Sequence, residues 1–275
     1  EALVLSATGR NADGELLPLY FPEDEGRTVR DPVWVYWLAG LLKTLPFSEG
    51  VVRAPSAIAG VLNVVLILLV GRELFGRTRP AAIAAGMLMV TPAHFLQSRI
   101  ATMQIAPVTF TLAWLFFLLR YLRTDRRRDL TVATCCLGFG MYSYVAALVI
   151  LPAYFLVTLV IVHGRSVVSS RAAMTSACAG FGLALLPMVV WFGLHPQQVV
   201  GLTGYYTQGE YNKGLGWQGF LGAQAISHMD AWWECYSPDK LFFSGDPDLR
   251  FSTRSAGYFL LATMVPLIVG LWSAR

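Results

Sequence analysis

Charged residues are scarce in this chain of 275 residues: Asp, Glu, Lys and Arg make up 14% of it, whereas hydrophobic residues make up 55%. That is too little charge to cover the surface of a water-soluble domain of this size. Most uncharged stretches are close to or longer than the ~20 residues that cross a bilayer as a helix. They lie at residues 54–71, 80–98, 100–119, 130–162, 172–194 and 255–274. The composition therefore excludes a soluble globular domain and predicts an integral membrane protein.

Disulfide, metal and nucleotide signals are also nearly absent. The four cysteines show no pairing or metal-ligand spacing, which favours packed or free thiols. There is no P-loop and no evident internal repeat. The net charge of +4 comes from loops between apolar segments, so it indicates membrane topology and no nucleic-acid partner. The chain begins with Glu1 instead of Met, and we expect it to be a piece of a longer protein.

The longest uncharged stretch, residues 130–162, has room for two spans. The run GFGMYSY at residues 138–144 is typical of a tight turn with aromatic side chains at the membrane interface. We therefore expect an all-α polytopic membrane protein with about seven membrane helices, the fourth being short. The predicted organisation is an outer loop at 1–53, six membrane segments at 54–194, a second outer loop at 195–255 and a seventh segment at 256–275.

Basic residues predict the orientation of the helices. Three basic connections, at residues 71–79, 120–129 and 163–171, alternate with more acidic ones. With Arg275 they hold eleven basic and three acidic residues, a net charge of +8, against ten basic and fourteen acidic residues, or −4, elsewhere. The three connections are predicted to face the cytoplasm. Residues 31–45, in the first outward loop, have an apolar core of about 13 residues, too short to cross ~30 Å of hydrocarbon, so we expect an interfacial helix there.

The placement of charge helps to separate an enzyme from a transporter. A transporter is expected to carry charged or broken-helix sites within its spans, and no charged residue lies inside any predicted span. The charges gather in the two outward loops, which suits an enzyme that acts on a lipid-borne substrate at the outer surface. A transporter or lipid flippase, and a non-catalytic homologue, remain the alternatives.

Several motifs, taken in order, resemble one family. Residues 30–77 combine the aromatic stretch RDPVWVYWL with RAPSA at 53–57 and LFGR at 74–77. TPAHFLQSR at 91–99 closes the next span, and FFSGDPDLRFSTRSAG at 242–257 leads into the last one. This order resembles the bacterial membrane glycosyltransferases of the C-type fold, which include the protein O-mannosyltransferases and the aminoarabinose transferases. The resemblance covers most of the chain.

The resemblance implies transfer of a sugar from a polyprenyl-phosphate donor to a lipid, glycan or protein acceptor, at the outer face of a bacterial inner or plasma membrane. A single displacement of this kind needs a carboxylate to take the proton of the acceptor hydroxyl. It also needs fixed cations to stabilise the leaving phosphate. No cofactor is required with certainty, and a divalent metal stays open.

Two acids are candidates for the catalytic base. In the family an Asp-Glu pair follows the first span, and by resemblance Glu1 matches the second acid of that pair. Asp31 is the second candidate, although an acid beside Pro32 also suits a helix cap or a turn. The acidic cluster at residues 22–26 is predicted to be a solvated loop.

Three arginines are candidates for binding the donor phosphate: Arg99, Arg53 and Arg250. Arg99 and Arg53 lie at the ends of predicted spans, where they could equally extend to lipid headgroups. Arg250 lies in the charged stretch before the last span. Gln104 stands near the place where many family members have an acid, and a neutral amide cannot act as a base.

Two weaker patterns contain residue types that bind metals: HMDAWWE at residues 228–234 and Asp-Pro-Asp at residues 246–248. In the first, the histidine does not share a helix face with both acids, so an interfacial helix anchored by its tryptophans is favoured. The second lacks the setting of a soluble nucleotide-sugar enzyme. We therefore assign no metal-binding residues to either pattern.

Overall fold

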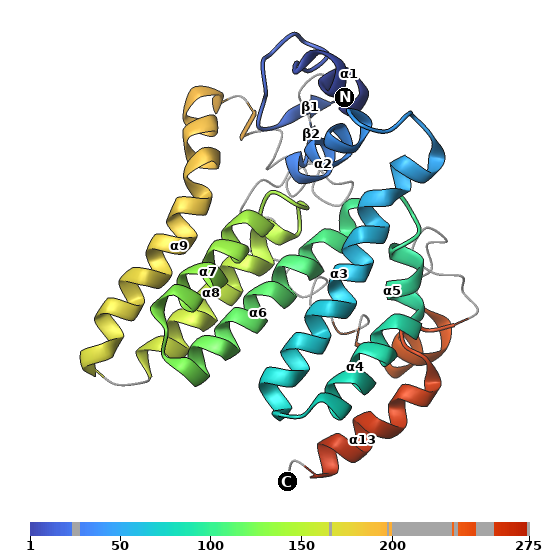
Figure 1. The fold of residues 1–275 in the computed structure, drawn as a ribbon, viewed down its shortest axis with the longest axis vertical. Coiled ribbons are helices and arrows are strands. Elements are labelled where there is room, and N and C mark those ends of the chain that lie inside the picture. The colour runs from blue at the N-terminus through green and yellow to red at the C-terminus, as the bar shows by residue number, and fades with distance from the viewer. Residues whose placement is uncertain are drawn as a thin grey trace.

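The computed structural model describes residues 1–23, 28–164, 167–196, 198–199, 233, 236–245 and 256–273. Nearly all of these residues are helical or connect helices (Figure 1). One hairpin breaks the pattern: β1 (Phe21–Glu23) pairs antiparallel with β2 (Thr28–Arg30), and Phe21 lies opposite Arg30. The all-α membrane class predicted from the apolar runs is confirmed.

A bundle of helices forms the body of the molecule. Its members are α3 (Glu49–Phe75), α4 (Thr78–Val90), α5 (Pro92–Gln97), α6 (Ala106–Thr124), α7 (Arg127–Gly140), α8 (Ala147–His163) and α9 (Val167–Leu194). Three helical stretches in the described part of the chain are long and apolar enough to span a membrane: Glu49–Phe75, Met103–Thr124 and Arg171–Leu194. The number of spans, about seven, stays a prediction.

The connections alternate between two ends of the bundle (Figure 1). The connections α3–α4, α6–α7 and α8–α9, which are the basic ones, lie at the lower end in that view. The connections α2–α3, α5–α6 and α7–α8 lie at the upper end. The fold therefore segregates the basic connections at one end, as the alternation along the sequence requires.

Local signals explain where the helices begin and end. The Ser48 side chain accepts a hydrogen bond from the backbone N–H of Val51 (3.4 Å) and so caps the start of α3. The helix ends at Gly76, which adopts the left-handed conformation (φ 61°). Thr91 is extended (φ −66°, ψ 122°) because it precedes Pro92, and this breaks the second apolar run into α4 and α5. The stretch 130–162 divides into two helices around residues 141–146, close to the predicted turn.

Small residues hold α7 close to α9 at the centre of the bundle. A Cβ added to Gly180 would lie 2.3 Å from the carbonyl oxygen of Thr131, and one added to Gly138 would lie 2.5 Å from the Cβ of Ala184. Close backbone approach of this kind is how helices gain packing contacts where lipid removes the hydrophobic drive between them. Beside this contact, a buried cluster joins α6, α7, α8 and α9.

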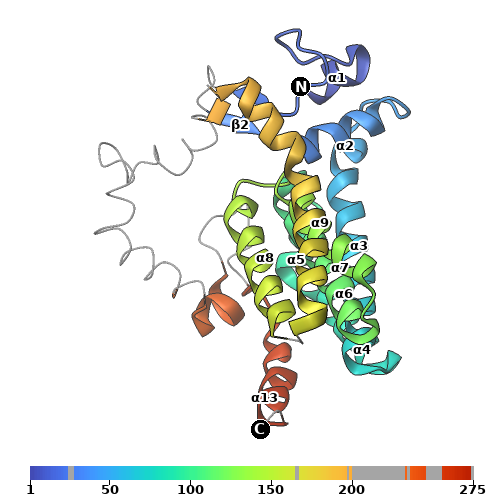
Figure 2. The same ribbon diagram turned by 90° about the vertical axis from the view of Figure 1, so that its left-hand side faces the viewer.

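Two short helices, α1 (Ala2–Thr8) and α2 (Pro32–Leu42), cover the upper end of the bundle (Figures 1 and 2). Leu5, Phe21, Val35 and Ala39 form their common core. With 11 residues, α2 is about 16 Å long, about half the ~30 Å of a bilayer core. This is the segment for which the sequence predicts an interfacial helix.

The remaining described elements are short. They are η2 (Met103–Ile105), η4 (Lys240–Ser244), η5 (Leu261–Thr263) and α13 (Met264–Ser273). In the side view α13 projects beyond the end of the bundle that carries the basic connections (Figure 2).

Candidate functional site

Asp31 is a buried acid at the start of α2. Only 7% of it is exposed. Its backbone is extended because Pro32 follows, and its side chain makes no capping hydrogen bond. Among the described residues its carboxylate has no hydrogen-bond or ion-pair partner, and burial raises its pKa to about 7. Asp31 thus occupies the N-cap position of α2, in keeping with the cap or turn given as its alternative role, but its carboxyl makes no capping bond and its pKa lies near neutral.

Two stacked tyrosines, Tyr20 and Tyr142, lie near the start of α2, where Asp31 stands. Tyr20 is 1% exposed, and its ring stacks on those of Tyr142 (6.4 Å between centroids) and Phe192 (5.0 Å). Burial, then the neighbouring Tyr142 and Asp31, raise the pKa of Tyr20. Burial also raises the pKa of Tyr142, so both phenols stay protonated at neutral pH, and the Tyr20 hydroxyl donates to Sδ of Met188 (3.2 Å). Sequence reasoning missed Tyr20 altogether and gave the aromatic residues of the 138–144 turn only an interfacial role.

Tyr142 is also joined to α9 by two hydrogen bonds. Its hydroxyl donates to the carbonyl oxygen of Ala184 (2.8 Å) and accepts from the backbone N–H of Met188 (3.0 Å). An unbroken helix pairs these two backbone groups directly, but Pro187 interrupts the ladder here. The phenol satisfies the polar groups beside the proline, as irregular backbone in a membrane helix requires.

A small apolar cavity of about 210 Å³ opens beside Asp31. Its lining comes from the stretch before β1, from α2, from the α7–α8 region and from the proline break of α9: Leu19, Pro32, Val33, Tyr36, Phe139, Tyr142 and Pro187. The hydroxyl of Tyr36 donates to the carbonyl oxygen of Pro18 (2.7 Å) and so fixes one wall. Asp31 itself is not part of the lining, but Pro32, the next residue in the chain, is.

Glu1 has a different environment. It is half-buried at the start of α1, and its carboxylate accepts a hydrogen bond from the backbone N–H of Ala12 (3.3 Å). This bond ties the start of α1 to the loop that follows it. Glu1 lies at the same end of the molecule as α2 (Figure 1).

Arg99 is one of the three arginines predicted to bind the donor phosphate. It is exposed just after α5, and its guanidinium lies 4.1 Å from the centroid of the Phe95 ring. The chain around it is anchored on α3, because the Ser56 hydroxyl donates to the carbonyl oxygen of Ile100 (2.6 Å). The ring and the anchored turn hold the guanidinium in place, and its contact with the donor phosphate stays a prediction.

The other two arginines are less informative. Arg53 is exposed on the first turns of α3 and pairs with Glu49 one turn earlier. Arg250 lies outside the described residues. Among the described residues no hydrogen bond or ion pair joins any two of Glu1, Asp31, Arg53 and Arg99. The elements that carry or flank them, which are α1, α2, the start of α3 and the α5–α6 connection, lie at the upper end of the bundle in Figure 1.

Unpaired polar atoms mark a second region, between α3, α5 and η2. Nδ2 of Asn63, Nε2 of His94 and Oε1 of Gln104 are buried with no hydrogen-bond partner. Buried polar groups in proteins are nearly always paired, with protein or with water. Sequence reasoning noted Gln104 as a departure from the family but missed Asn63 and His94, whose only signal was a polar residue within an uncharged run.

No group of three or more His, Cys, Asp or Glu residues able to hold a metal ion occurs in the part of the chain that the structure describes. The two weaker metal patterns, at residues 228–234 and 246–248, lie outside that part. Cys135, Cys136 and Cys178 are free thiols.

Comparison with known proteins identifies the bundle. Residues 30–191, more than half of the chain, match the sequence model of the dolichyl-phosphate-mannose-protein mannosyltransferases. The chain belongs to this family. It is therefore a membrane glycosyltransferase, and the predicted resemblance is confirmed. No curated protein and no solved structure matches the chain. The matched region contains Asp31, Arg53 and Arg99, whereas Glu1 and Arg250 lie outside it.

Proposed function

We propose that the protein transfers a sugar from a polyprenyl-phosphate donor to a glycan, protein or lipid acceptor at the outer face of the membrane, with Asp31 as the general base. The observation that carries this proposal is the environment of Asp31: a buried, unpaired carboxyl with a pKa of about 7, beside a cavity in a mannosyltransferase-family bundle. A base whose pKa is close to the working pH is the most effective kind.

The proposed reaction is a single displacement. The acceptor oxygen attacks the anomeric carbon, and its proton passes to the carboxylate. The bond between the anomeric carbon and the phosphate oxygen breaks, and the electron pair leaves with the polyprenyl phosphate. Arg99, with Arg53 and Arg250, would stabilise the charge that grows on that phosphate. Glu1 is the alternative base, and the same assay separates the two.

The test uses the full protein in detergent or proteoliposomes with a radiolabelled polyprenyl-phosphate sugar. Asp31→Asn should lower kcat by about 10²- to 10⁴-fold with little change in donor binding, because only the proton acceptor is lost. Arg99→Ala should weaken donor binding as well. Asp129→Asn, at the other end of the bundle, is the control for removing a buried carboxylate.

The pH profile identifies the base. If Asp31 takes the proton, kcat/KM rises with pH through about 7 in the wild type, and this rise disappears in Asp31→Asn. If Glu1→Gln lowers kcat while Asp31→Asn leaves it unchanged, Glu1 replaces Asp31 in the mechanism. If the wild type binds no polyprenyl-phosphate sugar and transfers none, the proposed donor is wrong.

A further inference from the structure

A second cavity, of about 370 Å³, lies at the end of the bundle that carries the basic connections. It is formed where α3 turns into α4 and where α6 passes beside that turn. Its charged and apolar lining residues are Arg72, Arg77, Arg123, Glu73, Leu69 and Phe116. The volume falls in the range of about 300–1,000 Å³ that is typical of small-molecule sites, whereas the 210 Å³ hollow beside Asp31 falls below it.

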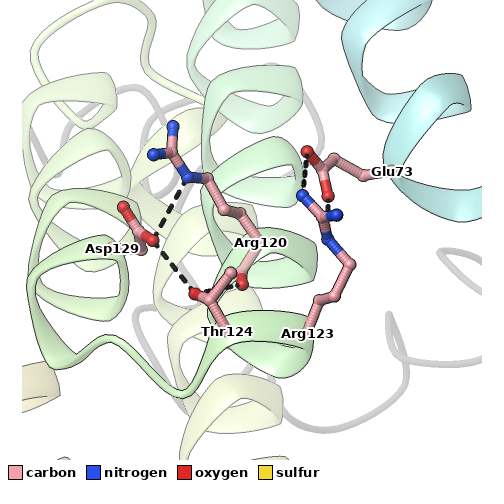
Figure 3. A network of polar contacts seen from close by, with 5 residues as sticks. All are labelled: Glu73, Arg120, Arg123, Thr124 and Asp129. Atoms are coloured by element: carbon pink, nitrogen blue, oxygen red, sulfur yellow. Dashed lines mark hydrogen bonds and ion pairs between the residues drawn. The ribbon is translucent and has the colours of Figure 1, made fainter.

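The charges around this cavity do not cancel. Glu73, with 14% of its side chain exposed, receives both Nε (2.8 Å) and Nη2 (3.1 Å) of Arg123 on its two oxygens (Figure 3). That pair is neutral and joins α3 to α6. Arg72 and Arg77 are exposed, and their side chains have no hydrogen-bond or ion-pair partner among the described residues. The cavity therefore carries two uncompensated positive charges.

Arg120, at the same end of the bundle, is by contrast paired with an acid. Arg120 lies one turn before Thr124 and contacts the buried carboxylate of Asp129 (3.3 Å), to which the Thr124 hydroxyl also donates (3.4 Å; Figure 3). Its charge is used within the protein, to join α6 to α7. Arg72 and Arg77 have no such internal acid, although they lie at the same end of the bundle.

The chain adds backbone donors at the same place. The helix α4 begins at Thr78, which lines the cavity, and it has no side-chain cap and no acid in its first turn. The positive end of its dipole lies at the cavity, but so does the negative end of α3, at Gly76, and the two helix ends oppose each other. The positive field of the cavity therefore comes from the two arginines.

We propose that this cavity binds a phosphate group, as part of an anionic lipid headgroup or as a free phosphate. Arginine donors in a fork match phosphate oxygens better than a point charge does. Leu69 and Phe116 offer an apolar floor beside the charges, which suits a phosphate that is attached to a lipid backbone. The site lies at the end of the bundle remote from Asp31 and is independent of the proposed reaction.

The test measures binding of two probes to the full protein in detergent: phosphatidylglycerol, with diacylglycerol as its phosphate-free control, and inorganic phosphate at constant ionic strength. Arg72→Gln combined with Arg77→Gln should weaken binding about tenfold or more, because two charge-assisted contacts disappear. The matched control is Arg126→Gln combined with Arg128→Gln, which removes the same charge from exposed residues outside the cavity. The control should change affinity far less.

A third variant acts in the opposite direction. Glu73→Gln removes the competing carboxylate and frees Arg123, so it should tighten binding even where it lowers the thermal stability of the protein. Binding of phosphatidylglycerol alone identifies a lipid headgroup, and equal occupancy by inorganic phosphate identifies a free anion. The proposal is overturned if the wild type binds neither probe, or if both double variants weaken binding equally.

Discussion

The backbone N–H of Val33 donates a hydrogen bond to the carbonyl oxygen of Tyr142, with 3.3 Å between nitrogen and oxygen. Through this bond the start of α2 is attached to the α7–α8 connection. The same tyrosine is attached to α9 through its hydroxyl. Asp31, two residues before Val33, is therefore held by the bundle rather than by the long loop that precedes it.

The hydroxyl of Tyr142 should stabilise the fold. In Tyr142→Phe the N–H of Met188 loses its acceptor and the carbonyl oxygen of Ala184 loses its donor. We expect the free energy of unfolding to fall by about 1–3 kcal/mol. Thermal unfolding in detergent measures this loss. Tyr154→Phe is the control, because the Tyr154 ring stacks on Trp114 (5.0 Å) and the substitution keeps that stack. Equal losses in the two variants would contradict the prediction.

Asp31 should make stability depend on pH. Its folded-state pKa of about 7 lies above the usual value near 3.9, so the folded protein retains a proton that the unfolded chain has lost. The stabilising contribution is complete below about pH 4 and is lost as pH rises through about 7. The Tm of the wild type should therefore fall from pH 5 to pH 8 more steeply than that of Asp31→Asn. Parallel pH profiles for the two proteins would show that Asp31 is not a buried, unpaired acid.

The contact between α7 and α9 should not tolerate a single methyl group. Gly180→Ala would place a Cβ 2.3 Å from the carbonyl oxygen of Thr131 and 2.4 Å from Oγ1 of Thr134. We expect about 1–3 kcal/mol of destabilisation from this overpacking. Gly182→Ala, two residues further along α9, meets no atom within 4 Å and should be neutral or stabilising by up to about 1 kcal/mol. Effects of the same sign at both positions would contradict this packing.

The helices were predictable because their signals are local. Hydrocarbon-length apolar runs define α3, α6 and α9, and Pro92 explains why the second run is split in two. The site was predictable only in part. Asp31 was found as a candidate, but its burial arises where the start of α2 meets Tyr142 of the α7–α8 connection, more than a hundred residues away in the chain. Contacts of that kind leave no spacing or periodicity in a single sequence.

The sequence also could not show which arginines are paired within the protein. The concentration of Arg72 and Arg77 in a basic connection was evident, and it indicated orientation alone. Which arginines have internal partners depends on the approach of α6 to α3 and α7 (Figure 3). The sequence therefore predicts the sign of charge at each end of the bundle, whereas the folded structure decides which charges remain free to bind a ligand.

Orientation of the bundle is the prediction on which the outward placement of Asp31 depends. The basic connections together with Arg275 carry +8 against −4 elsewhere, and the connections lie at the opposite end from α1 and α2. We therefore expect the α6–α7 connection to face the cytoplasm. In a variant whose four native cysteines are replaced, a cysteine at Asp13, which is exposed, should react with a membrane-impermeant maleimide in intact cells. A cysteine at Arg128, which is also exposed, should react only after the membrane is permeabilised. Labelling of position 128 in intact cells would invert the topology and place Asp31 on the cytoplasmic side.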